Sequence, residues 1–543
     1  MMRRILPARI VLISAAAILL FSALVFRDER FVEAAPTFEG VLTYHNNNQR
    51  TGWNPSETAL TFKNVNSSTF GKLFVIATDG LVDAQPLYAS NVSIPGNGTH
   101  NVLLVATEHD TVYGFDADTG STIWQATTLA ATETPSDNRG CSQVTPEIGI
   151  TSTPVIDLTE GPHGTIYAVA MSKDSSGNYH HRLHALDITS GAEEFGGPME
   201  IAAKYPGTGD NSEGGYVVFD PKRYKERAAL LLLNHIVYTS WSSHCDDRPY
   251  TGWIISYNGG TLAQQSVLNV TPNGSGGAIW GSGAGPATDT SGNIYFLDAN
   301  GTFDTGLNAG GFPANGDYGN AIIRLSTTKG KLAVHDYFNM YNTVSESDTD
   351  EDLGSGGAMV VPDFKDSSGT LHELVVGAGK DAHIYLANRV NMGKFSPNNN
   401  SQIYQEVTGA LAAGGVYSAP AYAVHRIYYG AAGDTIKAFT FNAGGLLNST
   451  PASATSTSFI YPGATPSISG TSSLILWAAH HSSPAVLHAY NANNLSVELY
   501  NSSQAPGGRD HFGNGNKFIT PTIANGKVYV GTTTGVGVFG LLK

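Results

Sequence analysis

An acidic stretch in the middle of the chain contains the strongest candidates for acid–base chemistry. It reads SDTDEDLG over residues 347–354 and places Asp348, Asp350 and Asp352 at alternate positions. Alternating acids occur in calcium-binding loops, but Met359 stands where such a loop ends in Glu. The residues alone therefore favour a solvated acidic loop.

A second group of candidates lies in SWSSHCDDRPYTGW, residues 240–253, the densest polar and aromatic cluster of the sequence. It supplies four ligand-binding candidates: His244, Asp246, Arg248 and Trp253. Aromatic faces beside carboxylates suit a polar ligand such as a sugar. The alternative is a loop that is ordered by a disulfide at Cys245 and by pairing of Arg with Asp.

Other stretches add little chemistry of their own. GGRDHFGNGNKF, residues 507–518, offers Arg509 or His511 as neighbours of the same site. The chain has no Gly-x-Ser-x-Gly element, and Lys380 in GAGKD is followed by Asp rather than by Ser or Thr. A serine hydrolase elbow and a phosphate-binding loop are therefore not supported. No Cys-x-x-Cys-His haem site occurs either.

Short strands must position these residues, because one hairpin pattern recurs through the chain. Its clearest copy is HDTVYGFDADTGSTIW, residues 109–124, with two apolar strands around an Asp-x-x-Thr-Gly turn. We expect Asp116 to bond the turn backbone, Gly120 to take a positive φ, and Trp124 to wedge between sheets. Further copies of the apolar strand begin at Leu183, Ile254, Ile322, Ile384, Ile436, Leu487 and Val536.

Eight such units predict an all-β fold, namely an eight-bladed β-propeller of four-stranded antiparallel blades. A strand containing proline precedes most copies, as in AQPLY and STPVI. GKLFVIATD, residues 71–79, is expected to close the ring by pairing with the last blade, which removes an exposed edge. The propeller would span 71–543 and follow a lead-in of residues 36–70. Seven blades is the alternative if the third copy belongs to an insertion.

The ordered series of motifs resembles the pyrroloquinoline quinone (PQQ) repeat propellers of the quinoprotein alcohol dehydrogenase-like superfamily. DTVYGFDADTGSTIW is similar to their tryptophan-docking repeat, and IGITSTPVID is similar to their second-blade strand. The likeness continues through GGAIWGSGAGPATDTSGNIYFLDANGTFD and VVGAGKDAHIYLANR. It covers much of the chain in the family's order.

The resemblance implies a quinone site in the channel, with a calcium ion beside it. By motif, Trp280 would stack on the quinone, Lys380 would contact it, and Asn300 would be a calcium ligand. The base would be Asp348, Asp350 or Asp352. The adjacent cysteine pair of the family is absent, and SKDSSGNYHH stands where the family has its Glu ligand. The scaffold is therefore expected to be retained while the site for PQQ and calcium is partly dismantled.

The N-terminus has the features of an export signal. Arg3, Arg4 and Arg9 precede an apolar run from Ile10 to Phe26. Residues 1–35 are therefore expected to be a cleaved signal peptide or a retained membrane anchor, since the run is just long enough to span a bilayer. The protein would be periplasmic or extracellular. Its two cysteines, Cys141 and Cys245, would then form one disulfide or remain separate thiols.

Charge restricts the class of partner. The 543 residues carry a net charge of −15, and no block of Lys or Arg follows the N-terminus. Nucleic acids and anionic membrane surfaces are therefore poor partners, and contact with a membrane would be limited to an N-terminal anchor. We expect a monomer that binds a small polar ligand or a protein of the cell envelope.

Two functional hypotheses follow, and the sequence leaves open whether the protein is an enzyme. The favoured one is a binding or scaffold propeller with a degenerate quinone site. The other is a PQQ-dependent dehydrogenase that oxidises alcohols or sugars. The missing Glu and cysteine pair favour the first, while Trp280, Asn300 and Lys380 support the second.

Overall fold

The computed structural model describes residues 38–328 and 331–543, and almost all of its regular structure is antiparallel sheet. The predicted signal or anchor over 1–35 lies outside the described residues. Residues 39–543 form one compact unit. Within the described part, no helix is both long and apolar enough to cross a membrane. The only α-helix described there is α1 (Thr343–Asp348), a single short segment.

Eight sheets of at least four strands occur in the described residues, and they are numbered here in chain order. The first contains β1 (Gly40–Val41), β4 (Leu87–Ile94), β5 (Gly98–Ala106), β6 (Thr111–Asp116) and β7 (Thr122–Thr127). The second contains β10 (Val155–Asp157), β11 (Thr165–Lys173), β12 (Tyr179–Asp187) and β13 (Met199–Glu200), with β8 (Thr134–Asp137) and β9 (Glu147–Ile148) added. The third contains β18 (Leu231–Leu233), β19 (Ile236–Ser240), β21 (Trp253–Asn258) and β22 (Gln264–Asn269). The fourth contains β23 (Ala287–Thr288), β24 (Ile294–Leu297), β25 (Ala321–Ser326), β26 (Ala333–Asn339) and β32 (Lys394–Phe395).

The remaining four sheets follow the same plan. The fifth contains β27 (Met359–Val360), β30 (Leu374–Ala378), β31 (Ile384–Asn388) and β33 (Gln405–Val407). The sixth contains β34 (Ala421–Ala423), β35 (Arg426–Tyr429), β36 (Asp434–Thr440) and β37 (Ser453–Phe459). The seventh contains β2 (Trp53–Asn54), β38 (Ser467–Ser469), β39 (Ile475–His480), β40 (Val486–Asn491) and β41 (Glu498–Asn501). The eighth contains β42 (Thr522–Ala524), β43 (Lys527–Thr532), β44 (Gly535–Leu541) and β3 (Phe70–Ala77).

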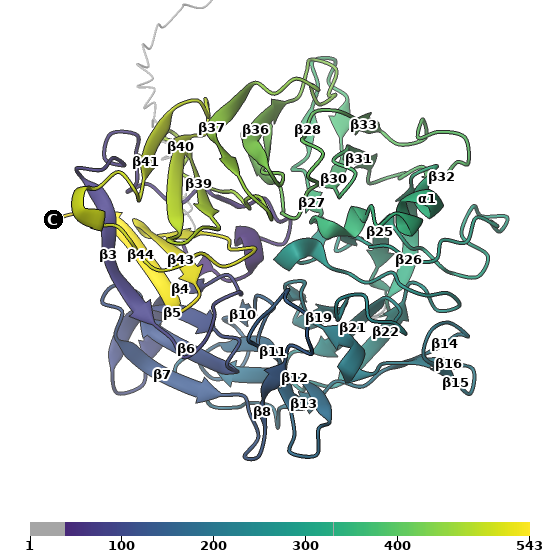
Figure 1. Cartoon of the computed structure of the whole chain (residues 1–543), viewed down its shortest axis with the longest axis horizontal. Helices are drawn as coiled ribbons and strands as arrows, with labels where there is room; N and C mark the ends of the chain where they lie inside the picture. Colours follow the sequence, from purple (N-terminus) through teal and green to yellow (C-terminus); the bar gives the residue numbers. More distant parts are fainter. Residues whose placement is uncertain (1–37, 329–330) are drawn as a thin grey trace, which may run out of the picture. The chain divides into compact units, whose positions relative to one another are not determined.

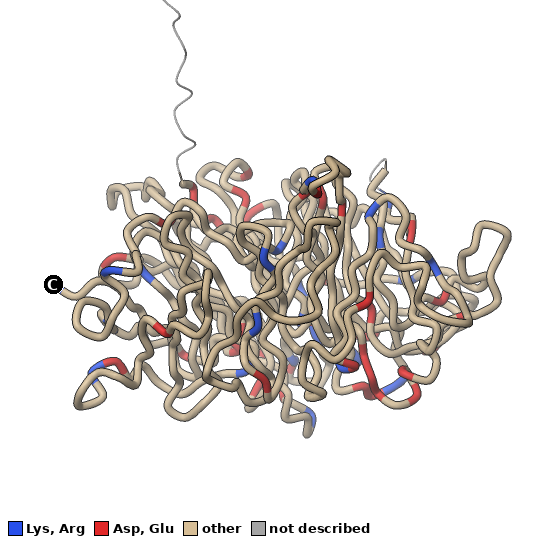
Figure 2. Tube along the Cα trace, turned by 90° about the horizontal axis from the view of Figure 1, so that it is seen from above, with Lys and Arg blue, Asp and Glu red and all other residues tan. Residues whose placement is uncertain are grey.

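Smaller elements decorate these sheets. They are the three strands β14 (Lys204–Pro206), β15 (Ser212–Glu213) and β16 (Tyr216–Val218), and the pairs β17 (Tyr224–Lys225) with β20 (Ser242–Ser243) and β28 (Phe364–Lys365) with β29 (Leu371–His372). Short 3-10 turns occur at η1 (Tyr44–Asn46), η2 (Pro221–Arg223), η3 (Gly281–Gly283), η5 (Leu353–Ser355) and η6 (Pro506–Gly508). Figure 1 shows the large sheets arranged around a common centre. In the view of Figure 2, Lys and Arg are scattered singly among Asp and Glu, without a basic block.

The recurrent hairpin has the structure that its sequence predicts. Each of its eight copies supplies a strand to a different sheet. In the clearest copy, Asp116 accepts hydrogen bonds from the backbone of the β6–β7 turn, and Gly120 has a φ of 77°. Trp124 is buried, and its indole N–H donates to the carbonyl of Ile188 in the neighbouring second sheet at 2.8 Å. Trp124 thus packs between sheets, as predicted.

The strand β3 lies at the edge of the eighth sheet. It pairs antiparallel with β44, in a register that runs from Phe70 opposite Leu541 to Ala77 opposite Gly535. Phe70 is fully buried against Trp477 of the seventh sheet and Phe539 of β44. A segment from near the start of the described chain therefore shares a sheet with the C-terminal strands.

Residues 39–54, termed the inner segment below, form hydrogen bonds with one strand of every large sheet. These strands are β4, β10, β18, β23, β27, β34, β38 and β42. Backbone amides in these strands donate to its carbonyls, including Ile156 to Leu42, Thr288 to Asn48 and Tyr422 to Thr51. The other contacts are Ser90 to Glu39, Val360 to Gln49, Ile468 to Gly52, the Asn48 side chain to Leu232, and the Asn54 side chain to Ile523. Each of these strands belongs to a different large sheet, so one stretch of chain connects all eight sheets.

Candidate functional site

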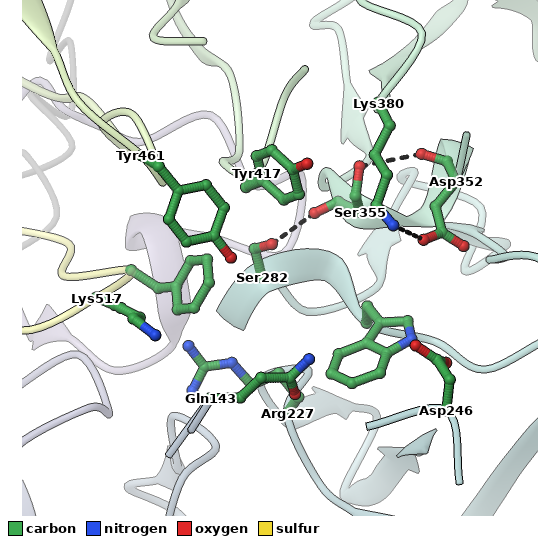
Figure 3. Close-up of a pocket in the computed structure, with 12 residues that line it drawn as sticks. Gln143, Arg227, Asp246, Ser282, Asp352, Ser355, Lys380, Tyr417, Tyr461 and Lys517 are labelled. Atoms are coloured by element: carbon green, nitrogen blue, oxygen red, sulfur yellow. Dashed lines mark hydrogen bonds and ion pairs between the residues drawn. The ribbon is translucent and has the colours of Figure 1, made fainter. Parts of the chain in front are cut away.

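A cavity of about 190 Å³ lies where loops from several sheets meet. Its lining residues are Gln143, Arg227, Asp246, Trp280, Ser282, Asp352, Ser355, Lys380, Tyr417, Tyr461, Lys517 and Phe518. Most of them stand shortly before one of the strands β18, β23, β27, β34, β38 and β42, so they share one end of the fold. Figure 3 shows the labelled side chains converging from these separate segments.

Three residues that the sequence singled out line this cavity together. Trp280 precedes η3, Asp352 precedes η5, and Lys380 follows β30. The Lys380 ammonium lies 2.6 Å from Asp352 and 2.7 Å from Asp350. The backbone amide of Lys380 also donates to the Asp352 carbonyl at 2.8 Å. Lys380, the predicted quinone contact, is therefore held by Asp350 and Asp352, two of the three predicted bases.

Burial is the largest influence on the protonation of Asp352. It raises the pKa of Asp352 to about 6, although the Lys380 ammonium acts in the opposite direction. Asp352 is only 6% exposed, whereas the side chain of Asp350 is 73% exposed. Asp348 is exposed at the end of α1 and lines an adjoining groove. Of the three acids, Asp352 is the one that faces the cavity with a pKa near neutrality, which suits a general base.

A cationic side of the cavity was not identified from the sequence. Arg227 is buried with its guanidinium 4.3 Å from the centre of the Phe518 ring, and its nearest carboxylate is Asp83 at 3.8 Å. The Lys517 ammonium donates to the backbone carbonyl of Ser142 at 3.1 Å. These cations face an aromatic wall, which favours a flat anionic ligand.

Lys225 adds a further charge behind this wall. Its ammonium lies 5.4 Å from the centre of the Trp280 ring and donates to Gln143 Oε1 at 2.7 Å. Burial, followed by the neighbouring Arg227, lowers the pKa of Lys225 to about 7. The charge of Lys225 therefore changes near neutral pH.

Oxygen ligands for calcium are few around Lys380. Asn300 donates its side-chain N–H to Asp350 at 3.0 Å, and its buried Oδ1 accepts no hydrogen bond. The backbone amide of Asn300 donates to Asp352 at 2.7 Å. Asn300 lines an adjoining open groove of about 370 Å³ rather than the cavity itself. The lysine ammonium already binds both carboxylates, so the oxygens near the pair without a hydrogen bond of ordinary geometry include Asn300 Oδ1 and the two carboxylate oxygens of the buried Asp298.

Of the alternative ligand cluster, Asp246 alone lines the cavity beside Trp280. Asp246 lines the cavity and accepts a hydrogen bond from the Tyr250 hydroxyl at 2.8 Å. Trp253 is fully buried, and its indole donates to the Tyr224 hydroxyl, so it is part of the core. The Arg248 side chain is 60% exposed and pairs with Asp210.

The other members of the predicted set also lie away from the cavity lining. His244 is buried, and burial lowers its pKa to about 4. Arg509 bonds to Asp510 and to the backbone of residues 67 and 70, while Lys517 and Phe518 of the same stretch reach the cavity instead.

The predicted disulfide is present and lies beside the site. Cys141 and Cys245 are bonded, with their Cα atoms 6.3 Å apart. Gln143 and Asp246, which line the cavity, are two positions and one position away from these cysteines. The bond therefore joins two wall segments of the cavity.

Comparison with known proteins identifies the fold. No protein-family model matches the sequence, and no curated protein matches it. Among solved structures, quinohemoprotein alcohol dehydrogenase from Comamonas testosteroni aligns with a TM-score of 0.61 at 14% identity, covering 94% of this chain and 81% of that one. A europium-containing methanol dehydrogenase aligns with a TM-score of 0.59 at 13% identity, covering 93% and 98%.

A second quinohemoprotein alcohol dehydrogenase gives the same result. The enzyme ADHIIG from Pseudomonas putida HK5 aligns with a TM-score of 0.59 at 12% identity and covers 93% of this chain and 80% of that one. Identity this low establishes the fold and not the activity. The chain therefore has the PQQ-like β-propeller fold that the sequence resemblance predicted.

Proposed function

We propose that this chain is an exported PQQ-like propeller of eight blades, closed by β3, that binds a small flat anion in the cavity beside Trp280. It acts as a ligand-binding propeller of the cell envelope or exterior, with a degenerate quinone site. The observation that carries the proposal is the pairing of cations with aromatic rings around one cavity. Arg227 and Lys517 face it, with the rings of Trp280 and Phe518 in the same lining.

The residues fit a quinone better than they fit calcium. PQQ is a flat, anionic ring system, so it matches an aromatic wall with adjacent cations. Calcium needs six to eight oxygen ligands, mostly from carboxylates and carbonyls. Asp350 and Asp352 are both bound by the Lys380 ammonium, which offsets one of their two negative charges and occupies one oxygen of each carboxylate. This arrangement supports binding of an organic anion without a calcium ion.

One observation favours a dehydrogenase as the second candidate. Asp352 has a pKa of about 6 and lies in the cavity that Trp280 lines. A bound quinone would supply the electron acceptor for oxidation of an alcohol. Asp352 would hold the proton of the alcohol hydroxyl, and Lys380 would orient the Asp352 carboxylate. This candidate requires that Asp352 be free to accept a proton from substrate.

The test is titration of the full chain with PQQ, with and without calcium, followed by calorimetry and quenching of tryptophan fluorescence. We expect saturable binding that is independent of calcium and weaker than about 1 μM, which corresponds to about −8.2 kcal/mol. Lys517→Gln should weaken binding about tenfold or more, because a charge-assisted contact contributes about 1.5–3 kcal/mol. Trp280→Ala should weaken it as well, because stacking contributes about 0.5–1.5 kcal/mol beyond burial.

Lys527→Gln is the matched control, because Lys527 pairs with Asp118 outside the cavity lining. It should bind PQQ like the unmodified chain. Binding that survives both Lys517→Gln and Trp280→Ala would show that the anion binds elsewhere. Tight calcium-dependent binding that is lost in Trp280→Ala and Lys380→Ala, with dye reduction by an alcohol, would instead establish the dehydrogenase.

A further inference from the structure

Three metal-ligating side chains meet at the edge between the second and third sheets. Asp157 ends β10, Glu160 lies in the following loop, and His235 lies in the turn between β18 and β19. One ligand atom from each lies within 4.8 Å of the other two. His235 Nδ1 is 2.8 Å from Asp157 Oδ2 and 3.2 Å from Glu160 Oε1. None of the three lines the cavity beside Trp280.

A single imidazole proton cannot satisfy this arrangement. His235 Nδ1 carries at most one hydrogen, yet two carboxylates approach it. Four-coordinate zinc with bonds of about 2.0–2.2 Å places neighbouring ligand atoms roughly 3.3 Å apart. The separations from His235 Nδ1 are 2.8 Å to Asp157 and 3.2 Å to Glu160, the second close to that value. Small shifts of the side chains would therefore give all three atoms the spacing of a metal site.

More negative charge surrounds the cluster than its one histidine can balance. Glu194 lies against the same loop, because a Cβ at Gly161 would be 2.6 Å from Glu194 Oε1. Burial raises the pKa of Glu194, and the negative charges of Asp187 and Glu160 raise it further. A divalent cation would relieve this repulsion among the carboxylates.

A buried hydroxyl provides an independent indication of a ligand. The Tyr167 side chain is fully buried, and its hydroxyl, which lies beside Thr165, forms no hydrogen bond of ordinary geometry. A Cβ at Gly259 would be 2.9 Å from this hydroxyl, and one at Gly260 would be 3.1 Å from Glu160 Oε2. The hydroxyl and the carboxylate thus lie against the same turn. Buried polar groups are normally paired, and a metal-bound water would give this hydroxyl a partner.

We propose that Asp157, Glu160 and His235 bind one divalent cation of the zinc class, which joins the second sheet to the third. One imidazole nitrogen and two carboxylate oxygens are a zinc ligand set, with water at the fourth position. Asp157 is nearly buried and held by Thr159, whose backbone amide and hydroxyl both donate to Asp157 Oδ1. The His235 side chain is 56% exposed, so the ion can enter from solvent.

The experiment uses the full chain without an affinity tag, stripped of metal with a chelator. Titration with ZnCl2 by calorimetry should show one strong site per chain, and CoCl2 should give visible d–d absorption. Zinc should also raise the melting temperature, because an ion that binds the folded state alone stabilises it. His235→Gln and Glu160→Gln should each weaken zinc binding by at least about tenfold.

His100→Gln is the matched control, because His100 pairs with Asp116 on the first sheet at 2.6 Å and lies outside the cluster. It should retain the zinc affinity, the cobalt spectrum and the rise in melting temperature. Absence of strong zinc binding overturns the proposal. The proposal is also overturned if both cluster variants bind zinc as tightly as the unmodified chain, or if His100→Gln loses as much affinity as they do. Glu160 and His235 are both solvent-accessible, so we expect at least one of the two cluster variants to fold normally. The zinc affinity of the folded variant then decides whether the proposal stands.

Discussion

A buried lysine should make anion binding at the cavity depend on pH above pH 7, where Asp352, with a pKa of about 6, is already ionised. Lys225 contacts the Trp280 ring, and burial lowers its pKa to about 7. Lys225 is therefore charged below pH 7 and neutral above it. If the cavity binds an anion, the affinity should fall as pH rises through 7, because the attraction of this ammonium is lost.

The check is the PQQ dissociation constant at pH 7 and at pH 8.5, with Lys225→Met beside the unmodified chain. We expect the variant to bind more weakly at pH 7 and to lose most of the pH dependence above it, because Asp352 is already ionised over this range. Lys527→Gln should keep the pH dependence. A variant whose affinity still changes with pH as steeply as that of the unmodified chain would place the titrating group elsewhere.

The sequence located part of the cavity and missed the rest for a physical reason. Trp280, Asp352 and Lys380 were found because motifs that resemble a known family carry them. Arg227 lies in no stretch that the sequence analysis singled out, and Lys517 lies in residues 507–518, where Arg509 and His511 were singled out instead. The sequence does contain one indication near Arg227, since charged residues stand directly before a strongly apolar strand.

At the scale of elements, period and turn chemistry were sufficient to predict the recurrent strand of each large sheet. The apolar hairpins recur in register with Gly-containing turns, and each copy lies in a separate sheet. The small sheet β14–β16 and helix α1 were not predicted. Both arise in long connections, where side-chain packing rather than a repeated pattern decides the local structure. Helix α1 ends at Asp348, which the sequence analysis assigned to an acidic loop or a base.

The disulfide between two cavity loops leads to a prediction about stability. It closes a separation of 104 residues, and cross-links of that length stabilise a protein by roughly 2–5 kcal/mol. The double variant Cys141→Ser/Cys245→Ser should lower the free energy of unfolding by about 2–4 kcal/mol. It should also weaken PQQ binding, because Gln143 and Asp246 lose their shared anchor.

Urea unfolding followed by circular dichroism measures the first effect, and the titration above measures the second. A reducing agent should lower the stability of the unmodified chain to that of the variant and leave the variant unchanged. Equal stability of both proteins under oxidising conditions would contradict this role for the bond.

At the scale of the whole molecule, the inner segment is the feature that the sequence did not predict. Residues 39–54 show no period of two or of 3.6, so they were assigned only to a lead-in. Their role comes from contacts with all eight sheets rather than from local pattern. Arg50 is the central residue of this network and is fully buried.

Replacing Arg50 with Met should therefore destabilise the whole ring. Its guanidinium donates to the carbonyls of Tyr44, Leu230 and Pro286 at 2.9, 3.1 and 2.9 Å. Each buried carbonyl that loses its donor costs about 1–3 kcal/mol, so Arg50→Met should lower the free energy of unfolding by at least about 3 kcal/mol. Arg248→Met is the control, since its exposed pair with Asp210 should contribute at most about 1 kcal/mol. Urea unfolding of the two variants provides the comparison. Equal, small losses would contradict this role for Arg50 and would leave the backbone contacts of the inner segment to connect the sheets.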